Sequence, residues 1–200
     1  VLQHADIVTT SLTKTFSGAG NVAGGAVILR SGSASAERVR ERMMDQELAS
    51  PLFELDALIL ERNSRFYEER VLATNEIAAE VFEFVKGHSA VSRACFPSIQ
   101  TRGFYDQVRK ESGGYGALFS VELSGGEAAA RTLYDCIKVS KGPSLGTDFT
   151  LACPYTLLAH YGELEWAAER GAGRDLLRFW IGLEDPEDLI ERFRKAFDSI

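Results

Sequence analysis

The chain has 200 residues, of which 45% are hydrophobic and 26% are charged, and its formal net charge is −7. That length allows one or two domains. An acidic charge without basic clusters argues against a nucleic-acid partner, and no apolar run approaches the roughly 18 residues of a membrane span.

The three cysteines, Cys95, Cys136 and Cys153, are odd in number and far apart in the sequence. This pattern is typical of free, buried thiols in a reducing compartment and predicts a cytoplasmic protein without disulfides. The histidines are scattered as well, so we expect no metal site. Because the chain begins at Val1 and runs directly into an apolar segment, we expect it to be a piece of a longer protein.

The first predicted elements surround a glycine-rich loop. Residues 4–12 are short, β-branched and bounded by turn residues, which predicts a mostly buried strand. Residues 26–29 predict a second strand, with a turn after it. Residues 35–48 have a helical pattern, for which Ser35 is the candidate N-cap.

A longer helical pattern follows Pro51. Apolar residues recur near helical spacing from Phe53 until Gly87, with charged residues between them, which predicts one long helix or two joined end to end. Because such a helix often connects domains, we place a domain boundary near residue 70.

The remaining elements predict an antiparallel sheet with helices. In residues 117–123, alternation of apolar and polar side chains indicates a half-buried strand. Asp185 and Pro186 predict the N-cap and first turn of a final helix, and basic residues occupy its later turns. Further predicted elements are a helix over 127–134 and strands over 91–96, 137–139 and 176–181.

The stretch SLTKTFSGAGNVAGG, residues 11–25, carries the candidate chemistry. Its glycine spacing does not match the dinucleotide fingerprint, and its lysine precedes the glycines instead of following them as in a P-loop. A lysine amine such as that of Lys14 forms a Schiff base with an aldehyde, and pyridoxal 5′-phosphate (PLP) is the common aldehyde cofactor. Ser11 and Thr13 are near enough in sequence to bind its phosphate, while the alternative is a glycine-rich turn with a chance lysine.

These residues resemble the lysine signature of the Cys/Met-metabolism enzymes that use PLP, and the resemblance continues in the right order through the chain. The segments that carry it are residues 6–18 (DIVTTSLTKTFSG), 55–60 (LDALIL), 113–123 (GGYGALFSVEL), 144–146 (SLG) and 177–189 (LRFWIGLEDPEDL). The family's residues before the lysine strand have no counterpart in this sequence. The resemblance therefore implies roughly the C-terminal half of such an enzyme, with little or no activity by itself.

The resemblance also implies site roles. Lys14 would form the internal aldimine and then move protons as general acid and base, while Ser11 and Thr13 would hold the phosphate. Arg178 would bind the substrate carboxylate, helped by Ser144. Taken without the motif, the residue pattern favours Arg178 as a surface arginine on an edge strand over a binding residue.

The implied fold is an α/β fragment of a PLP-dependent transferase of fold type I. Residues 1–70 would belong to the large PLP-binding domain, and residues 71–200 would form a small C-terminal domain with a mainly antiparallel sheet. The full-length protein would act on small amino-acid substrates as a homo-oligomer, either a dimer or a tetramer.

Similarity to the fungal cystathionine γ-synthase branch implies transfer of an activated homoserine to cysteine, giving cystathionine. The alternatives within the family are a β- or γ-lyase and an O-acyl-homoserine sulfhydrylase. A different class remains open, a non-catalytic dimerisation module. It is motivated by departures from the family pattern such as Pro143 for an acidic residue and Trp180 for serine.

Overall fold

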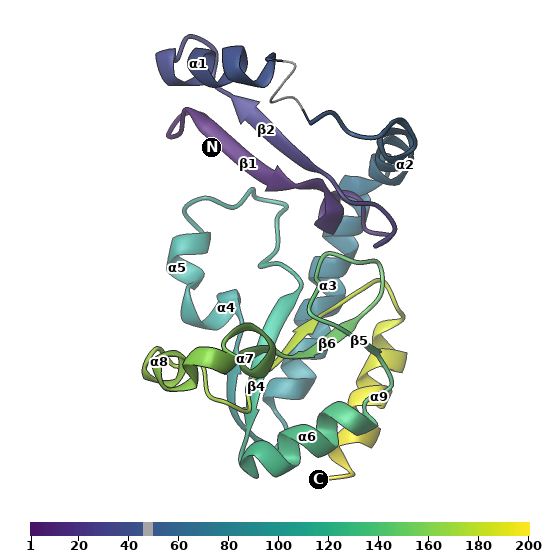
Figure 1. The fold of residues 1–200 in the computed structure, drawn as a ribbon. Coiled ribbons are helices and arrows are strands. Elements are labelled where there is room, and N and C mark those ends of the chain that lie inside the picture. The colour runs from purple at the N-terminus through teal and green to yellow at the C-terminus, as the bar shows by residue number, and fades with distance from the viewer. Residues whose placement is uncertain (46–49) are drawn as a thin grey trace. The chain divides into compact units, whose positions relative to one another are not determined.

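The computed structural model describes residues 1–45 and 50–200, which form two compact units, residues 1–67 and 68–200 (Figure 1). The elements of the first unit are β1 (Ile7–Ser11), η1 (Leu12–Phe16), β2 (Gly25–Leu29), α1 (Ala34–Met43) and α2 (Glu54–Ser64).

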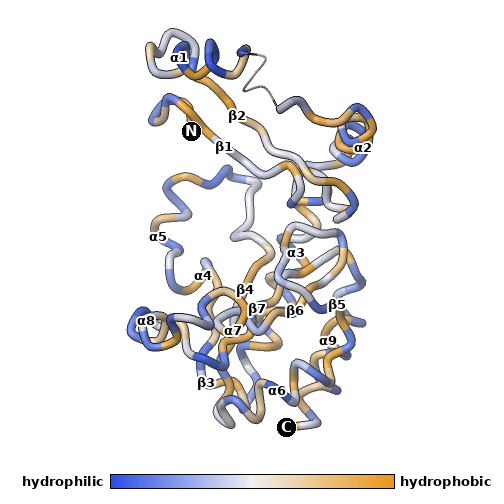
Figure 2. Tube along the Cα trace, viewed as in Figure 1, coloured by the Kyte–Doolittle hydropathy of each residue, from blue (hydrophilic) through white to orange (hydrophobic). Residues whose placement is uncertain are grey.

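The two strands of the first unit pair antiparallel, so that Ser11 at the end of β1 lies opposite Gly25 at the start of β2. The pairing confirms both predicted strands, although β1 runs from Ile7 to Ser11 instead of over residues 4–12. The prediction that this strand is mostly buried is wrong, because four of its five residues are exposed within this chain. The residues of β2 are hydrophobic (Figure 2), yet the side chains of Val27 and Ile28 are exposed among the described residues.

The predicted N-cap of α1 is wrong by two residues. The side chain of Ser33 accepts a hydrogen bond from the backbone N–H of Ala36 at 3.3 Å, and Ser35 lies inside the helix. Ser33 takes this role because its backbone is extended and it follows Gly32, whose φ of 77° reverses the chain direction. The helix ends at Met43, and the last residues of the prediction, 46–48, lie outside the described residues.

The helical pattern after Phe53 corresponds to two helices, α2 and α3 (Tyr67–Lys86), as the second alternative predicted. The end of α3 at Lys86 agrees with the expected stop at Gly87. Within the described residues, no helix is both long enough and apolar enough to cross a membrane.

The second unit is built on a five-stranded sheet in the order β3-β4-β7-β6-β5. All pairs are antiparallel except β5 with β6. Besides α3, its elements are β3 (Val91–Cys95), α4 (Pro97–Gln100), α5 (Arg102–Tyr105), β4 (Leu118–Leu123), α6 (Gly126–Cys136), β5 (Ser140–Lys141), β6 (Leu151–Pro154), α7 (Tyr155–Ala159), η2 (Tyr161–Glu163), α8 (Leu164–Glu169), β7 (Leu177–Trp180) and α9 (Pro186–Phe197).

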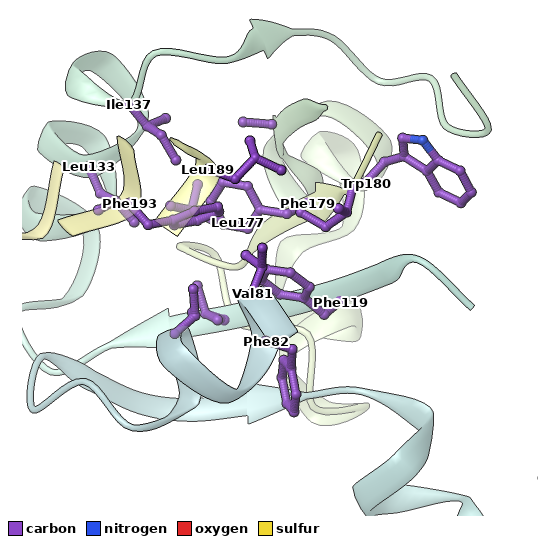
Figure 3. Close-up of a cluster of buried hydrophobic side chains, with 14 of the residues drawn as sticks. Val81, Phe82, Phe119, Leu133, Ile137, Leu177, Phe179, Trp180, Leu189 and Phe193 are labelled. Atoms are coloured by element: carbon purple, nitrogen blue, oxygen red, sulfur yellow. The ribbon is translucent and has the colours of Figure 1, made fainter. Parts of the chain in front are cut away.

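One face of this sheet holds the hydrophobic core. Phe119 and Val121 of β4 are buried and alternate with half-buried neighbours, which confirms the alternation predicted for this strand. Residues from α3, α6 and α9 pack against them, among them Phe82, Leu133 and Phe193 (Figure 3). The opposite face of β4 and β7 therefore remains for Ser120, Arg178 and their neighbours.

Two strand predictions in this unit need correction. Residues 137–139 are not a strand. Ile137 is the residue that caps α6, and its apolar side chain, 1% exposed, is buried in the core. The strand β7 lies between β4 and β6, so the interpretation of Arg178 as an edge-strand residue is wrong. The prediction for α9 is confirmed, since Asp185 accepts a hydrogen bond from Asp188 N at 3.0 Å and Pro186 opens the helix.

Candidate active site

Lys14 lies in η1, the single turn that follows β1. Its own φ and ψ, −83° and −132°, are not helical and interrupt the turn at the lysine. Backbone hydrogen bonds continue on both sides of it, from Ser17 N to Leu12 O at 3.1 Å and from Gly18 N to Lys14 O at 2.9 Å. Gly18 has φ of 75°, so the chain leaves the turn in a conformation that glycine adopts without steric cost.

The glycine-rich loop is closed at its base by Thr13 and Gly24. The hydroxyl of Thr13 donates to Gly24 O at 3.3 Å and accepts from Gly24 N at 3.0 Å, and Leu12 N donates to Gly24 O at 2.9 Å. On the far side of the loop, Asn63 of α2 donates to Ser17 Oγ and to Asn21 Oδ1, both at 2.9 Å. The loop that carries Lys14 is therefore held at two places.

Ser11 and Lys14 line one cavity of about 340 Å³ in the first unit. Phe16 and Tyr67 form an aromatic part of its wall, with ring centroids 5.8 Å apart. The volume lies within the usual range for small-molecule sites, roughly 300–1,000 Å³. The cavity thus combines a hydroxyl, an amine and aromatic surface.

This donor set fits a cofactor that carries an aldehyde and a phosphate. Ser11 precedes η1 without capping it through its side chain, so the turn does not use its hydroxyl. Lys14 Nζ supplies the amine on the wall of the same cavity. The Thr13 hydroxyl is engaged with Gly24, so it reaches a phosphate only by exchanging its 3.3 Å contact with Gly24 O.

Arg178 and Ser144 meet in the second unit. Arg178 Nη2 donates to the backbone carbonyls of Pro143 and of Ser144, the latter at 3.3 Å. The guanidinium carbon lies 5.0 Å from the ring centroid of Tyr155. Sheet register places Ser120 of β4 on one side of Arg178 and Cys153 of β6 on the other. A cavity of about 270 Å³ opens beside Arg178, with Cys95, Ser120 and Tyr155 in its wall.

The segment of residues 143–150, which carries Ser144, is anchored by residues of the segment 177–189, which we call the closing motif. Trp180 Nε1 donates to Thr147 O at 2.7 Å, so the tryptophan that replaces the family's serine has a structural partner. Glu184 accepts from Thr150 N at 2.7 Å and from Thr150 Oγ1 at 2.8 Å. These contacts hold the part of the segment that follows Ser144.

Two ionisable groups near this segment have perturbed pKa values. Burial raises the pKa of the Cys153 thiol, and the positive charge of Arg178 offsets part of that effect. Burial also raises the pKa of Asp148, against the attraction of Arg70, whose Nη1 lies 3.4 Å from Asp148 Oδ1. Across residues 1–45 and 50–200, no group of three or more His, Cys, Asp or Glu side chains is arranged to hold a metal ion.

The structure places Ser11, Thr13 and Lys14 in the first unit and Ser144 and Arg178 in the second. Two residues of these sites, Asn63 and Tyr155, had no role predicted from the sequence. Tyr155 directly follows Pro154, the last residue of the strand β6. A residue in this position is expected at the end of a strand, where side chains can reach a site. Asn63 carried no such signal, because its partners lie more than 40 positions away along the chain.

Comparison with known proteins identifies the family of the chain. The model of the family described as Cys/Met metabolism PLP-dependent enzyme matches residues 2–198. The chain is 42% identical over 197 residues to cystathionine gamma-synthase of Neurospora crassa, covering 98% of the chain and 31% of that protein. It is 30% identical over 198 residues to L-methionine gamma-lyase of Fusobacterium nucleatum subsp. polymorphum, covering 98% and 50%.

The fold has a solved counterpart as well. Cystathionine gamma synthase from Xanthomonas oryzae pv. oryzae in complex with cystathionine superimposes with a TM-score of 0.86 at 30% identity, covering 98% of the chain and 50% of that structure. The chain therefore spans between about a third and a half of the length of these relatives.

Proposed function

The chain belongs to the Cys/Met metabolism family of PLP-dependent enzymes, and from this premise we propose that the protein containing it joins an O-acyl-homoserine to cysteine. In this γ-substitution the bond between homoserine Cγ and the ester oxygen breaks, and a bond between Cγ and the sulfur of cysteine forms. The carboxylic acid leaves, the thiol gives up its proton, and cystathionine is the product. The observation that carries the proposal is the placement of Lys14 and Ser11 on one cavity at the end of β1.

We propose that Lys14 Nζ bonds the cofactor aldehyde and that Ser11 and Thr13 donate to its phosphate. The chemistry that bound PLP supplies is electron withdrawal, which stabilises negative charge on the substrate's α-carbon. Lys14 Nζ, once released, takes the proton from that carbon and returns protons farther along the substrate. The hydrogen bond that Thr13 Oγ1 accepts from Gly24 N keeps this amine at the cavity while its role changes.

We assign the substrate carboxylate to Arg178, because a planar guanidinium suits a two-pronged carboxylate. Its Nη2 donates to the carbonyls of Pro143 and Ser144, so a carboxylate would bind through Nε and Nη1, or through a fork that includes Nη2 by replacing one of these carbonyls. By the same proposal residues 1–70 belong to the large cofactor domain, residues 71–200 form the small domain, and the full-length protein is a homo-oligomer.

A γ-lyase is the second candidate, favoured by the similarity to L-methionine gamma-lyase. Both reactions use the same lysine chemistry, and they differ in what attacks after the leaving group departs. A panel of substrates separates them. The synthase consumes O-acyl-homoserine only with cysteine and accumulates cystathionine, whereas the lyase cleaves cystathionine or methionine alone.

The cofactor assignment is tested on the full-length protein that contains this chain. The protein is incubated with PLP and reduced with sodium borohydride, which makes a lysine–aldehyde linkage permanent, and its peptides are mapped by mass spectrometry. We expect the pyridoxyl group on Lys14 in the natural protein and none at this site in Lys14→Ala. Label on another lysine, or no label in a folded protein with excess PLP, contradicts the assignment.

A further inference from the structure

Arg178 is held from two directions in the second unit. Backbone carbonyls of Pro143 and Ser144 accept from its Nη2, and the ring of Tyr155 lies against its guanidinium with the carbon 5.0 Å from the centroid. A cation over an aromatic face is attracted to it at this separation. The carbonyls therefore fix one edge of the guanidinium, and the ring fixes its plane.

Tyr155 in turn is held by a chain of contacts from the helices that follow it. Its backbone N–H donates to Leu176 O at 3.1 Å. Its hydroxyl lies 3.4 Å from His160 Nε2, and His160 Nδ1 lies 2.8 Å from Glu163 Oε1. The indole of Trp166 lies next to the imidazole, with ring centroids 5.8 Å apart. We call Tyr155, His160, Glu163 and Trp166 the tyrosine brace.

The chemistry of the three side chains decides which of them donates and which accepts each hydrogen bond of the brace. A carboxylate only accepts, so Glu163 takes the hydrogen of His160 Nδ1–H. In the neutral ring this leaves Nε2 as an acceptor, and the Tyr155 hydroxyl then donates to it. The imidazole is 22% exposed, so the pair is sheltered but reachable by solvent. Tyr155 is thereby held at two points, at its backbone N–H and at its hydroxyl.

One residue of the brace lines the cavity beside Arg178. Tyr155 lies in the wall of that cavity together with Cys95 and Ser120. A free arginine loses rotamer freedom when it binds a carboxylate, and an arginine already held in the binding geometry avoids most of that loss. Removal of the ring is therefore expected to weaken carboxylate binding without altering the lysine chemistry in the other unit.

We propose that Tyr155 is a positioning residue for Arg178, and that His160 and Glu163 set its position, so that the tyrosine brace determines affinity for the substrate carboxylate. This inference rests on the proposed function, since it assigns the substrate carboxylate to Arg178. The ligand class is an α-amino acid with a free carboxylate.

The test uses the full-length protein loaded with PLP, and the variants Tyr155→Leu and Tyr155→Phe. The steady-state kcat and KM are measured for an O-acyl-homoserine at saturating cysteine. Binding of L-norleucine, an amino acid without a leaving group, and of its carboxamide is measured by calorimetry. Tyr161→Leu is the matched control, because Tyr161 is a neighbouring tyrosine that is 73% exposed and stands outside the brace.

For Tyr155→Leu we expect the KM for O-acyl-homoserine and the Kd for norleucine to rise about tenfold, the order of one desolvated cation–π contact. The kcat and the affinity for norleucinamide should stay within about twofold of the natural values. Tyr155→Phe keeps the ring but loses the contact with His160, so its Kd for norleucine should lie between the two. Tyr161→Leu should match the natural protein.

Unchanged KM and Kd in Tyr155→Leu would overturn the inference while the proposed function stands. Equal losses for norleucine and norleucinamide would overturn it too, because they would indicate a general structural defect instead of a weakened carboxylate contact. A natural protein that neither turns over the substrates nor binds norleucine would refute the proposed function, and this inference with it.

Discussion

Replacement of Gly182 by alanine tests how tightly the closing motif holds the segment of residues 143–150. A Cβ built on Gly182 would lie 2.5 Å from both Cα and C of Phe149, and 2.6 Å from Asp148 O. These are backbone atoms, so no side-chain rotation relieves the overlap. The backbone of one segment has to move away from the other.

That movement also strains two hydrogen bonds, from Gly182 N to Thr150 Oγ1 at 3.0 Å and from Leu183 N to Asp148 O at 2.8 Å. Overpacking costs about 1–3 kcal/mol, and one weakened hydrogen bond adds about 1 kcal/mol. We therefore expect Gly182→Ala to lower the free energy of unfolding of the second unit by about 2–4 kcal/mol. With a urea m-value of about 2 kcal/mol per M, the midpoint should fall by about 1–2 M.

Tryptophan fluorescence in urea measures this unit selectively, because both tryptophans, Trp166 and Trp180, lie in residues 68–200. Gly142→Ala is the matched control. A Cβ on Gly142 would meet only Leu151 Cδ2, at an ordinary 3.7 Å, and its midpoint should stay close to the natural one. If Gly182→Ala unfolds at the same urea concentration as Gly142→Ala, the contact with Phe149 does not constrain the segment.

Two further predictions concern Thr13, at the base of the glycine-rich loop, and Cys153, next to Arg178 in the sheet. Thr13→Val removes the acceptor of Gly24 N–H, so hydrogen exchange of that amide with solvent should speed up roughly tenfold or more. The control Thr13→Ser keeps the hydroxyl and should preserve slow exchange. Equal exchange rates in Thr13→Val and the natural protein would refute the closure of the loop by Thr13. Cys153 is a group whose folded pKa is raised by burial, so less of it is thiolate at pH 8 than in the unfolded chain. In a Cys95→Ala/Cys136→Ala protein, a disulfide reagent should therefore react slowly until urea is added, and reaction at the rate of the unfolded chain would contradict this.

The local elements were predictable where one segment contains its own determinants. For α9, the capping carboxylate of Asp185, the proline at the first position and the apolar stripe all occur within a few residues of each other. The alternation in β4 was readable for the same reason, since each face of a strand repeats every second residue. At α1, two serines two positions apart both satisfied the local rule, and only the backbone after Gly32 selected Ser33.

The sequence by itself determined the family, the α/β class and the candidate residues Lys14, Ser11 and Arg178, because these depend on an ordered set of short motifs. Only the tertiary structure decided what those residues touch. It engaged Thr13 with Gly24 and set Tyr155 against Arg178. These contacts join positions 11 and 23 residues apart, the first across a loop and the second between a helix and a strand. Local composition does not specify which partners the folded backbone brings into contact.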